Sequence, residues 1–381
     1  MTARNDGIEV LWYLTAPDGR NPWTASGARK IDLPYLRQIA SAVDQLGFTG
    51  ALLATGPHDT WVLGSSLITA TERMRFLIAV HPQLISPVLA AKMTQTFDQF
   101  SQGRVLLNII NGNTAQMRAY GSTLEHDERY AYTDEWITVW RKAVAGERLD
   151  FQGKYITVEG QALQLETVQK PAPPLWFGGS SLAAHETAAK HIDTYLSWGE
   201  PPAQVAEKIR ELSALAARHG RTLRYGIRLY LIVRDTDEEA WEEANRLLGT
   251  MDEATVGRTQ ALLRNSDSVG QQRMLSLHNG RIPEDARELE IYPNLWSGLS
   301  LVRPGPGTAI VGSPKTVLAR IQEYRDAGIS TFIFSGIPLL EEAYRVAELI
   351  LPHLPVTYDA GWAGDADARR EPVFTWASSL P

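Results

Sequence analysis

Short apolar segments alternate with longer amphipathic segments along most of the chain. The apolar segments predict strands at residues 8–14, 50–53, 75–80, 104–110, 175–177, 194–197, 224–234 and 330–334. Apolar residues at helical spacing predict helices at 33–46, 61–69, 88–100, 126–146, 182–190, 203–219, 237–248, 314–327 and 340–351. Strands that alternate with helices predict parallel strands joined by helical crossovers. Eight such units close into a (β/α)8 TIM barrel, an α/β fold.

Three segments interrupt this rhythm, at about 111–125, 146–172 and 249–306. Residues 149–158 alternate around Gly153 and predict an exposed hairpin. Residues 249–306 are polar, show no clean strand period and are too long for a normal connection, which predicts a lid or disorder. We expect one barrel domain over 1–355, followed by an irregular tail over 356–381 that is rich in Pro, Gly and Asp.

Composition restricts the possible partners. The net charge is −7 and no basic block occurs, which argues against nucleic acid or an anionic membrane as a partner. The chain has 0 Cys, so disulfides and thiolate chemistry are excluded. No signal peptide or membrane-spanning stretch is evident, which favours a cytoplasmic protein. The 8 His show no metal-binding spacing, so we expect no metal site. Dinucleotide, P-loop and hydrolase-elbow motifs do not occur either.

A candidate phosphate site follows the fifth strand. Gly178 and Gly179 allow a sharp turn where a side chain would obstruct, and Ser180 and Ser181 then open a helix. Serine is a favoured N-cap, and the first helical turn offers unpaired N–H groups to an anion. An ordinary strand-to-helix turn is the alternative for this stretch alone.

His126 and Tyr130 stand four residues apart at the start of a long predicted helix, with Asp127 as its expected N-cap. This spacing places both side chains on one face, from which they could contact a phosphate. The alternative is that His126 caps the helix and Tyr130 packs in the core.

Barrel active sites lie at the carboxyl ends of the strands. Polar and aromatic residues at or near those ends are Thr55, His58, Asp59, His81, Asn108–Thr114, Ser180, Ser181, Trp198, Arg228 and Tyr230, with Arg303 contributed by the 249–306 insertion. Arg228 and Tyr230 share one face of an otherwise apolar strand. A guanidinium in such a place needs an anionic partner, either a neighbouring carboxylate or an anionic ligand.

From residue 11 to about 352 the chain resembles the reduced-flavin-dependent alkanesulfonate monooxygenases of the bacterial luciferase-like family. The stretches that carry the resemblance are 126–130 (HDERY), 174–181 (PLWFGGSS), 195–202 (YLSWGEPP), 225–229 (YGIRL), 267–274 (DSVGQQRM), 294–298 (NLWSG), 301–303 (LVR) and 340–345 (LEEAYR). Matches spread over nearly the whole barrel are specific for the family and less specific for the substrate.

The resemblance implies a luciferase-type barrel in a two-component system. A separate NAD(P)H:flavin reductase would supply reduced FMN (FMNH2), which this chain would bind and react with O2. The resulting flavin peroxide or hydroperoxide would oxygenate C1 of an organosulfonate, an alkanesulfonate or a sulfosugar, and release sulfite and an aldehyde. This places the chain in sulfur metabolism. Relatives form dimers and tetramers, which implies a homo-oligomer.

The resemblance also assigns roles to residues. His126, Tyr130, Ser180 and Ser181 match the phosphate-binding positions of the family, and Gly179 and Asn108 complete the expected cofactor site. Trp198, Arg228 and Arg303 match positions around the sulfonate and the reacting flavin, and Tyr230 is expected to act as a hydrogen-bond donor near the flavin. The insertion before the eighth strand corresponds to a mobile lid that shields the reaction from water.

The substrate side departs from the family pattern. Pro17 replaces a histidine after the first strand, Tyr230 replaces a second histidine, and Ile337 and Leu339 replace a tyrosine and a histidine after the eighth strand. The cysteine of the second strand-to-helix loop is absent. Either the pocket accepts a different sulfonate, or the reaction is another oxygenation that needs no proton relay from those groups.

Three alternatives to desulfonation stay open. The first is a luciferase-like monooxygenase acting on a sulfone, an amine or a heterocycle. The second is a deazaflavin-dependent dehydrogenase on the same fold. The third is a ligand-binding protein without turnover, which would leave both arginines without a reason to lie in the pocket.

Overall fold

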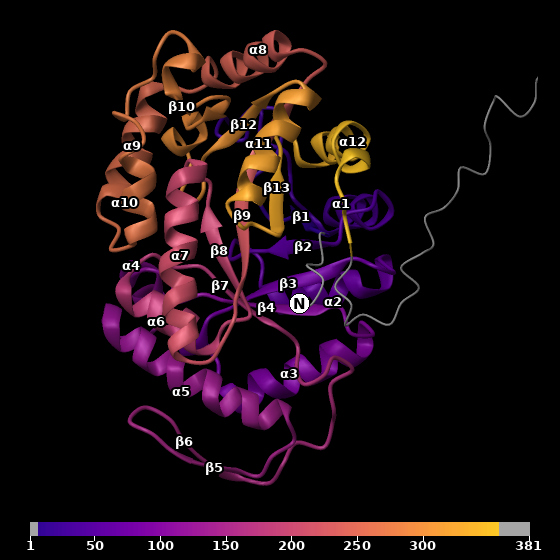
Figure 1. Cartoon of the computed structure of the whole chain (residues 1–381), viewed down its shortest axis with the longest axis vertical. Helices are drawn as coiled ribbons and strands as arrows, with labels where there is room; N and C mark the ends of the chain where they lie inside the picture. The colour runs from indigo at the N-terminus through magenta and orange to yellow at the C-terminus, as the bar shows by residue number, and fades with distance from the viewer. Residues whose placement is uncertain (1–6, 358–381) are drawn as a thin grey trace, which may run out of the picture.

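The computed structural model describes residues 7–357, in which eight parallel strands close into a barrel (Figure 1). The strands are β1 (Glu9–Tyr13), β2 (Gly50–Leu53), β3 (Arg75–Val80), β4 (Val105–Ile109), β7 (Leu175–Phe177), β8 (Thr194–Trp198), β9 (Arg224–Val233) and β13 (Thr331–Ser335). Their order around the barrel is β9-β13-β1-β2-β3-β4-β7-β8, and pairing of β8 with β9 closes it. The predicted fold class is confirmed.

Helices surround the barrel and bury one face each against the strands. They are α1 (Leu33–Gln45), α2 (Thr60–Leu67), α3 (Pro87–Phe100), α5 (His126–Val144), α6 (Leu182–His191), α7 (Pro202–Arg218), α8 (Asp237–Leu248), α11 (Pro314–Asp326) and α12 (Leu339–Leu349). Side-chain N-caps start many of them: Asp32 precedes α1, Ser86 precedes α3 and Ser313 precedes α11. Each cap satisfies a backbone N–H that has no partner inside the helix.

The core lies between the strands and the helices. Every residue of β1, β2, β3, β4, β7 and β13 is buried, which explains why these strands read as continuous apolar runs. Trp136 and Trp140, one turn apart on α5, are fully buried and stack with ring centroids 6.4 Å apart. Much of the tryptophan content is therefore packed in the core.

Of the two expectations for residues 249–306, disorder was wrong, and a lid stays a prediction. This insertion contains α9 (Glu253–Arg264), α10 (Val269–Leu275), β10 (Glu290–Tyr292) and β11 (Leu295–Trp296), together with short 3-10 turns at Ala286–Leu289 and Gly298–Leu301. Its Asp and Ser residues include helix caps, since Asp252 starts α9 and Ser268 starts α10. Polar composition therefore concealed helices that begin at capping residues.

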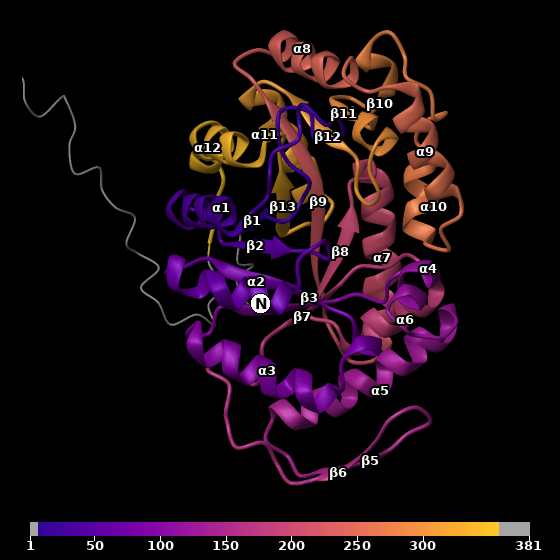
Figure 2. The same cartoon turned by 180° about the vertical axis from the view of Figure 1, so that it is seen from behind.

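The sheet formed at the end of this insertion continues from the long strand β9. The first half of β9 pairs with β8, and its second half, from Tyr230 onward, pairs with β12 (Ala309–Gly312). Strands β11 and β10 then continue the sheet outward from β12. Helices α9 and α10 lie beside this extension, on the same side of the barrel as α7 (Figures 1 and 2). The insertion is thereby attached to the end of the strand that contains Arg228.

Smaller findings concern the other two interrupting segments, the start of α5 and the tail. The segment 111–125 contains a short helix, α4 (Thr114–Ala119). The predicted hairpin is present as β5 (Leu149–Gln152) and β6 (Thr157–Gly160), which project from the barrel below α5 in Figure 1. Helix α5 starts at His126 with Glu125 as its N-cap and Glu128 completing a capping box, so the expectations of an Asp127 or His126 cap were wrong. The predicted tail beyond residue 357 lies outside the described residues.

Candidate active site

The predicted phosphate cradle is formed by backbone that comes very close to its neighbours. A Cβ on Gly178 would lie 2.9 Å from the carbonyl oxygen of Leu196, and one on Gly179 would lie 2.7 Å from the Cβ of Ala184. Both positions therefore require glycine. Ser181 is the N-cap of α6, and its hydroxyl accepts a hydrogen bond of 3.2 Å from the Ala184 N–H. The cap thus fixes the first turn of α6 directly after the carboxyl end of β7.

His126 and Tyr130 lie beside this turn, as predicted. Their ring centroids are 5.1 Å apart, and the Tyr130 ring meets Phe177 of β7 edge-on at 6.4 Å. Burial raises the pKa of Tyr130, while hydrogen bonding to Ser181 and Asn111 acts in the opposite direction. Tyr130 is consequently a protonated donor beside Ser181, at the start of α6.

Ser180, next to Gly179 in the same turn, contacts a residue of the neighbouring strand β8. The hydroxyl of Tyr195, on β8, donates to the carbonyl oxygen of Gly179 and also interacts with Ser180. His126 presents its Nδ1 to the carboxylate of Asp127 at 2.7 Å, which leaves Nε2 as its remaining polar atom. The structure therefore brings together four of the six predicted cofactor residues, Ser180, Ser181, His126 and Tyr130, around Gly179.

Asn108 contributes from the neighbouring strand. It is 5% exposed on β4, in register with Trp176 of β7, and its Oδ1 is buried without a hydrogen-bond partner. Leaving a buried acceptor unsatisfied costs about 1–3 kcal/mol, so the Oδ1 of Asn108 is suited to accept a hydrogen bond from a ligand. The Asn108 amide, the glycine turn and the hydroxyls fit the phosphate and ring system of FMN.

A second cluster, which we call the arginine–tyrosine cluster, consists of Tyr13, Arg228, Tyr230 and Arg303. The guanidinium carbon of Arg228 lies 3.7 Å from the centroid of the Tyr13 ring. That of Arg303 lies 4.8 Å from the Tyr230 centroid and 6.0 Å from the Tyr13 centroid. Trp198 pairs with Arg228 in the register of β8 and β9. The predicted substrate residues are thus close together, and Tyr13 joins them.

The arginine–tyrosine cluster is electrostatically unusual. Within the described part of the chain, no carboxylate forms a salt bridge with Arg228 or Arg303, and the Nε and Nη2 atoms of Arg228 are buried without hydrogen-bond partners. Burial, together with repulsion from Arg228, lowers the pKa of Arg303 to about 9. Burial also lowers the pKa of Arg228. Both arginines are partly exposed, and two neighbouring cations without a carboxylate are suited to an anionic ligand.

The insertion packs onto this region. A Cβ on Gly270 of α10 would lie 3.3 Å from the indole ring of Trp198. Asp267, just before α10, accepts hydrogen bonds from the backbone N–H of Thr114 at 3.2 Å and from Arg129 at 3.0 Å. Residues 267–270 therefore connect the insertion to α4, α5 and the end of β8, and cover the space beside Trp198.

A second ionic contact ties the insertion to the barrel. Arg273 of α10 lies 3.3 Å from the carboxylate of Glu200, which also binds the ammonium group of Lys208 on α7. Glu200 and Lys208 are 3% and 6% exposed, so this carboxylate is enclosed between two cations. Glu200 follows Trp198 by two residues, and the contact fixes the backbone that carries this tryptophan.

Other predicted polar residues are engaged in contacts of their own. His58 is exposed, and Asp59 caps α2 by accepting from the Val62 N–H at 2.8 Å. His81 accepts from the Thr55 hydroxyl at Nε2 and donates from Nδ1 to the Ile110 carbonyl, and burial lowers its pKa. Residues 7–357 contain no cluster of three or more acidic, His or Cys side chains that could hold a metal, and no helix there is long and apolar enough to cross a membrane.

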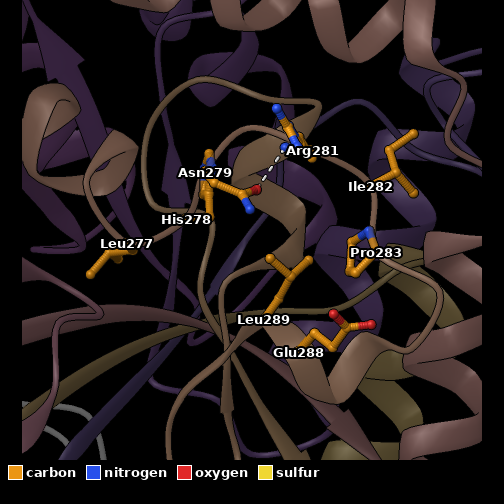
Figure 3. Close-up of a pocket in the computed structure, with 8 residues that line it drawn as sticks. All are labelled: Leu277, His278, Asn279, Arg281, Ile282, Pro283, Glu288 and Leu289. Carbon is orange, nitrogen blue, oxygen red and sulfur yellow. Dashed lines mark hydrogen bonds between the residues drawn. The ribbon is translucent and has the colours of Figure 1, made fainter.

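Two surface hollows lie apart from the predicted residues. Figure 3 shows one of about 250 Å³ within the insertion, where Asn279 accepts from the Arg281 N–H above Leu289. The other, of about 400 Å³, lies between α6, α7 and α10, and its lining includes Glu200, Lys208 and Arg273. Neither includes a residue of the arginine–tyrosine cluster or of the phosphate cradle.

Sequence reasoning missed three participants: Tyr13, Arg129 and Asp267. Tyr13 was assigned to an apolar strand, although its place at the last position of β1 was a signal. Arg129 lies between His126 and Tyr130 in sequence but is 1% exposed and points to Asp267. Contacts across 138 residues have no local pattern that would reveal them.

Comparisons with known proteins agree with this arrangement at the level of the fold. EDTA monooxygenase from Chelativorans sp. BNC1 matches with a TM-score of 0.74 at 17% identity, over 91% of this chain and 93% of that one. Riboflavin lyase, solved with modified FMN and riboflavin, matches with a TM-score of 0.72 at 18% identity, over 91% of each chain. An F420-dependent secondary alcohol dehydrogenase matches with a TM-score of 0.65 at 14% identity, over 90% of this chain and 98% of that one.

A family model described as luciferase-like monooxygenase matches residues 11–331, from β1 to the start of β13. The match includes the phosphate cradle, the arginine–tyrosine cluster and the insertion. With its closed parallel barrel and a match over most of its length, the chain belongs to the luciferase-like monooxygenase family.

Proposed function

We propose that this chain is a two-component monooxygenase that uses reduced FMN and O2 to cleave the C–S bond of an organosulfonate, with an alkanesulfonate or a sulfosugar as substrate. A separate NAD(P)H:flavin reductase supplies the reduced flavin. The observation that carries the proposal is the pair of partly exposed guanidiniums, Arg228 and Arg303, which have no carboxylate partner in the described chain and lie in the same barrel mouth as a phosphate cradle.

Backbone N–H groups and side-chain hydroxyls of this chain bind the cofactor. Ser180, Ser181, Tyr130 and the first turn of α6 hold the phosphate, since hydrogen-bond donors and the positive end of a helix dipole favour an anion there. The unpartnered Oδ1 of Asn108 accepts from the flavin ring. When bound, reduced FMN supplies the electrons that activate O2.

Charged side chains bind the substrate at the other end of the site. A sulfonate presents three oxygens, and the unpartnered Nε and Nη2 of Arg228 can donate to two of them side by side. Arg303 adds a second positive charge beside Tyr230. Trp198, covered by Gly270, excludes water from this end, which strengthens each charged contact.

The reaction balances in atoms and charge. The sulfonate, reduced FMN and O2 give an aldehyde, bisulfite, oxidised FMN and water. One oxygen atom of O2 enters the aldehyde and the other leaves as water. Negative charge that develops on the departing sulfite remains beside the same two guanidiniums that bound the sulfonate, so the charges that bind the substrate also stabilise the leaving group.

Sulfite release tests this proposal. The purified protein is incubated with FMN, NADH, a generic flavin reductase and a panel of sulfonates, from methanesulfonate to long alkyl, aryl and sugar sulfonates. The proposal expects sulfite from one substrate class, in proportion to the O2 consumed above a control without substrate. Sulfite from none of them, while reduced FMN still binds, would contradict desulfonation and keep the family assignment.

A second candidate is oxygenation of a substrate other than a sulfonate, such as a sulfone, an amine or a heterocycle. The buried apolar Ile337 and Leu339 favour it, because they offer no proton relay after the eighth strand. The similar fold of EDTA monooxygenase adds that an amine bearing carboxylates would also meet two guanidiniums. Substrate-dependent O2 consumption without sulfite would select this candidate. A shift in melting temperature with F420 and none with FMN would instead indicate a dehydrogenase.

A further inference from the structure

Tyr13 occupies the centre of the arginine–tyrosine cluster. It is the last residue of β1, is 5% exposed, and faces Arg228 across the barrel mouth, with the guanidinium carbon 3.7 Å from its ring centroid. The guanidinium of Arg303 approaches the same ring to 6.0 Å. An aromatic face attracts a cation, and the attraction increases when both groups are removed from water. The ring of Tyr13 therefore positions both arginines.

The phenol group of Tyr13 supplies balancing charge to the two guanidiniums. Among the described residues, Tyr13 is the one ionisable group that stabilises the charged form of Arg228 or of Arg303. The effect is mutual: the two guanidiniums and the Thr15 hydroxyl lower the pKa of Tyr13 although burial opposes this. Burial raises the pKa of Tyr225, which is buried on β9 beside Ser213, and this is the ordinary effect on a tyrosine.

We propose that Tyr13 is the internal counter-group of Arg228 and Arg303, which holds both guanidiniums in place in the free protein and takes up a proton when a substrate anion binds to them. The identity of that anion as a substrate group rests on the proposed function. Tyr13 is a positioning residue in this account, because it acts through the two arginines.

The proton balance is simple. At a pH above the ionisation of Tyr13, its phenolate oxygen balances part of the charge of the two guanidiniums before an anion binds. An incoming anion brings its own negative charge, so one O–H bond forms on Tyr13 with a proton from solvent, and the charge of the cluster is unchanged. Departure of the anion reverses the step. Because one proton is linked to binding, the affinity for the anion decreases by about tenfold per pH unit above the ionisation of Tyr13.

Arg303 is the competing explanation for such a pH dependence. Its pKa is lowered to about 9, and loss of its proton would also weaken anion binding. The titratable and charged groups that act on Tyr13 are Arg228 from β9 and Arg303 from the end of the insertion. The variant Tyr13→Phe separates the two explanations, because it keeps the aromatic ring and removes the ionisable oxygen. The pH dependence disappears if it belongs to Tyr13 and persists if it belongs to Arg303.

The first experiment follows tyrosinate absorbance in the near ultraviolet against pH, without flavin or substrate. We expect one tyrosine in the wild-type protein to ionise at lower pH than the rest, and this step to be missing in Tyr13→Phe. The matched control Tyr225→Phe keeps the early step and loses one that ionises late. Circular dichroism shows that each variant is folded over the range used. An identical early titration in wild-type protein and Tyr13→Phe would overturn the proposal.

The second experiment repeats the titration in the presence of methanesulfonate. The proposal expects the early step of the wild-type protein to move to higher pH, and the affinity of Tyr13→Phe for methanesulfonate to be flat across the same range. An unmoved step would overturn the exchange of phenolate for substrate anion. Neither titration requires turnover, so an early step that moves with methanesulfonate, in a protein that releases no sulfite, would reject the proposed reaction and keep the role of Tyr13.

Discussion

The phosphate cradle and the arginine–tyrosine cluster lie in the same barrel mouth but are built in different ways. The cradle comes from one continuous stretch, 175–184, whose glycines approach neighbouring atoms too closely for any side chain. The cluster takes Tyr13 from β1, Arg228 and Tyr230 from β9, and Arg303 from the end of the insertion. The cofactor end depends on local backbone, and the substrate end depends on charges brought together over long distances.

This difference predicts how substitutions act. A backbone cradle loses affinity gradually when one hydroxyl is removed, because helix N–H groups remain. A pair of neighbouring charges loses its function when either member is removed, because the remaining group cannot balance the ligand alone. Variants in the two regions are therefore expected to separate cofactor binding from turnover.

The largest effect is expected for Arg303→Ala. Removing one charged donor from the site where negative charge develops lowers turnover by about a hundredfold or more. Reduced FMN should still bind, because the cradle is unchanged, and sulfite release together with FMN affinity measures both. Arg258→Ala, an exposed arginine on α9 of the same insertion, is the control and should keep wild-type activity. Unchanged sulfite release from Arg303→Ala would remove this residue from the site.

Ser181→Ala should mainly affect the cofactor. Loss of a hydroxyl that contacts the phosphate is expected to weaken FMN binding by about tenfold, since a hydrogen bond to a charged group contributes about 1.5–3 kcal/mol. It also removes the N-cap of α6, which costs about 1 kcal/mol of stability. Ser86→Ala is a matched control, because Ser86 caps α3 in the same way at an exposed site. Equal FMN affinity in the two variants would contradict a phosphate at Ser181.

Asp267→Asn tests whether the insertion covers the substrate end. Asp267 joins Thr114 and Arg129, but its side chain is 33% exposed, so solvent screens the ion pair. We expect the contact to contribute about 1 kcal/mol or less, and the sulfite formed per O2 consumed to decrease by about fivefold at most. Glu284→Gln, exposed on the same insertion, provides the comparison. If Asp267→Asn and Glu284→Gln form the same amount of sulfite per O2 consumed, the contact of Asp267 with Thr114 and Arg129 does not retain the reacting oxygen.

The smallest effect concerns pH and His81. Burial lowers the pKa of His81 below its ordinary value of about 6.5, so the folded protein keeps this ring neutral. Below about pH 6.5 the unfolded chain binds a proton that the fold excludes, and the free energy of unfolding decreases with falling pH by up to about 1.4 kcal/mol per pH unit. The free energy of unfolding, measured with denaturant between pH 5 and pH 7, should change less with pH for His81→Gln than for the wild-type protein. An equal change in the two proteins would place the acid sensitivity elsewhere, for example at His185 or His278.

The same contrast explains what the sequence could predict. The barrel was predictable because buried strands are continuous apolar runs, and the cradle was predictable because glycine, serine and helix start are adjacent. Arg228 stood out as a charge in an apolar strand. The role of Tyr13 could not be inferred, since an aromatic residue in an apolar strand is normally core. The order in residues 249–306 was hidden because helices that begin at Asp252 and Ser268 are rich in polar residues.

A single-turnover experiment tests the central claim most directly. The protein is mixed with reduced FMN and a sulfonate in the absence of oxygen, O2 is then added, and sulfite and oxidised FMN are measured together. The account predicts one sulfite for each protein-bound reduced FMN that is oxidised, and none when Arg303→Ala replaces the wild-type protein. Complete flavin oxidation without sulfite, across the whole sulfonate panel, would contradict it.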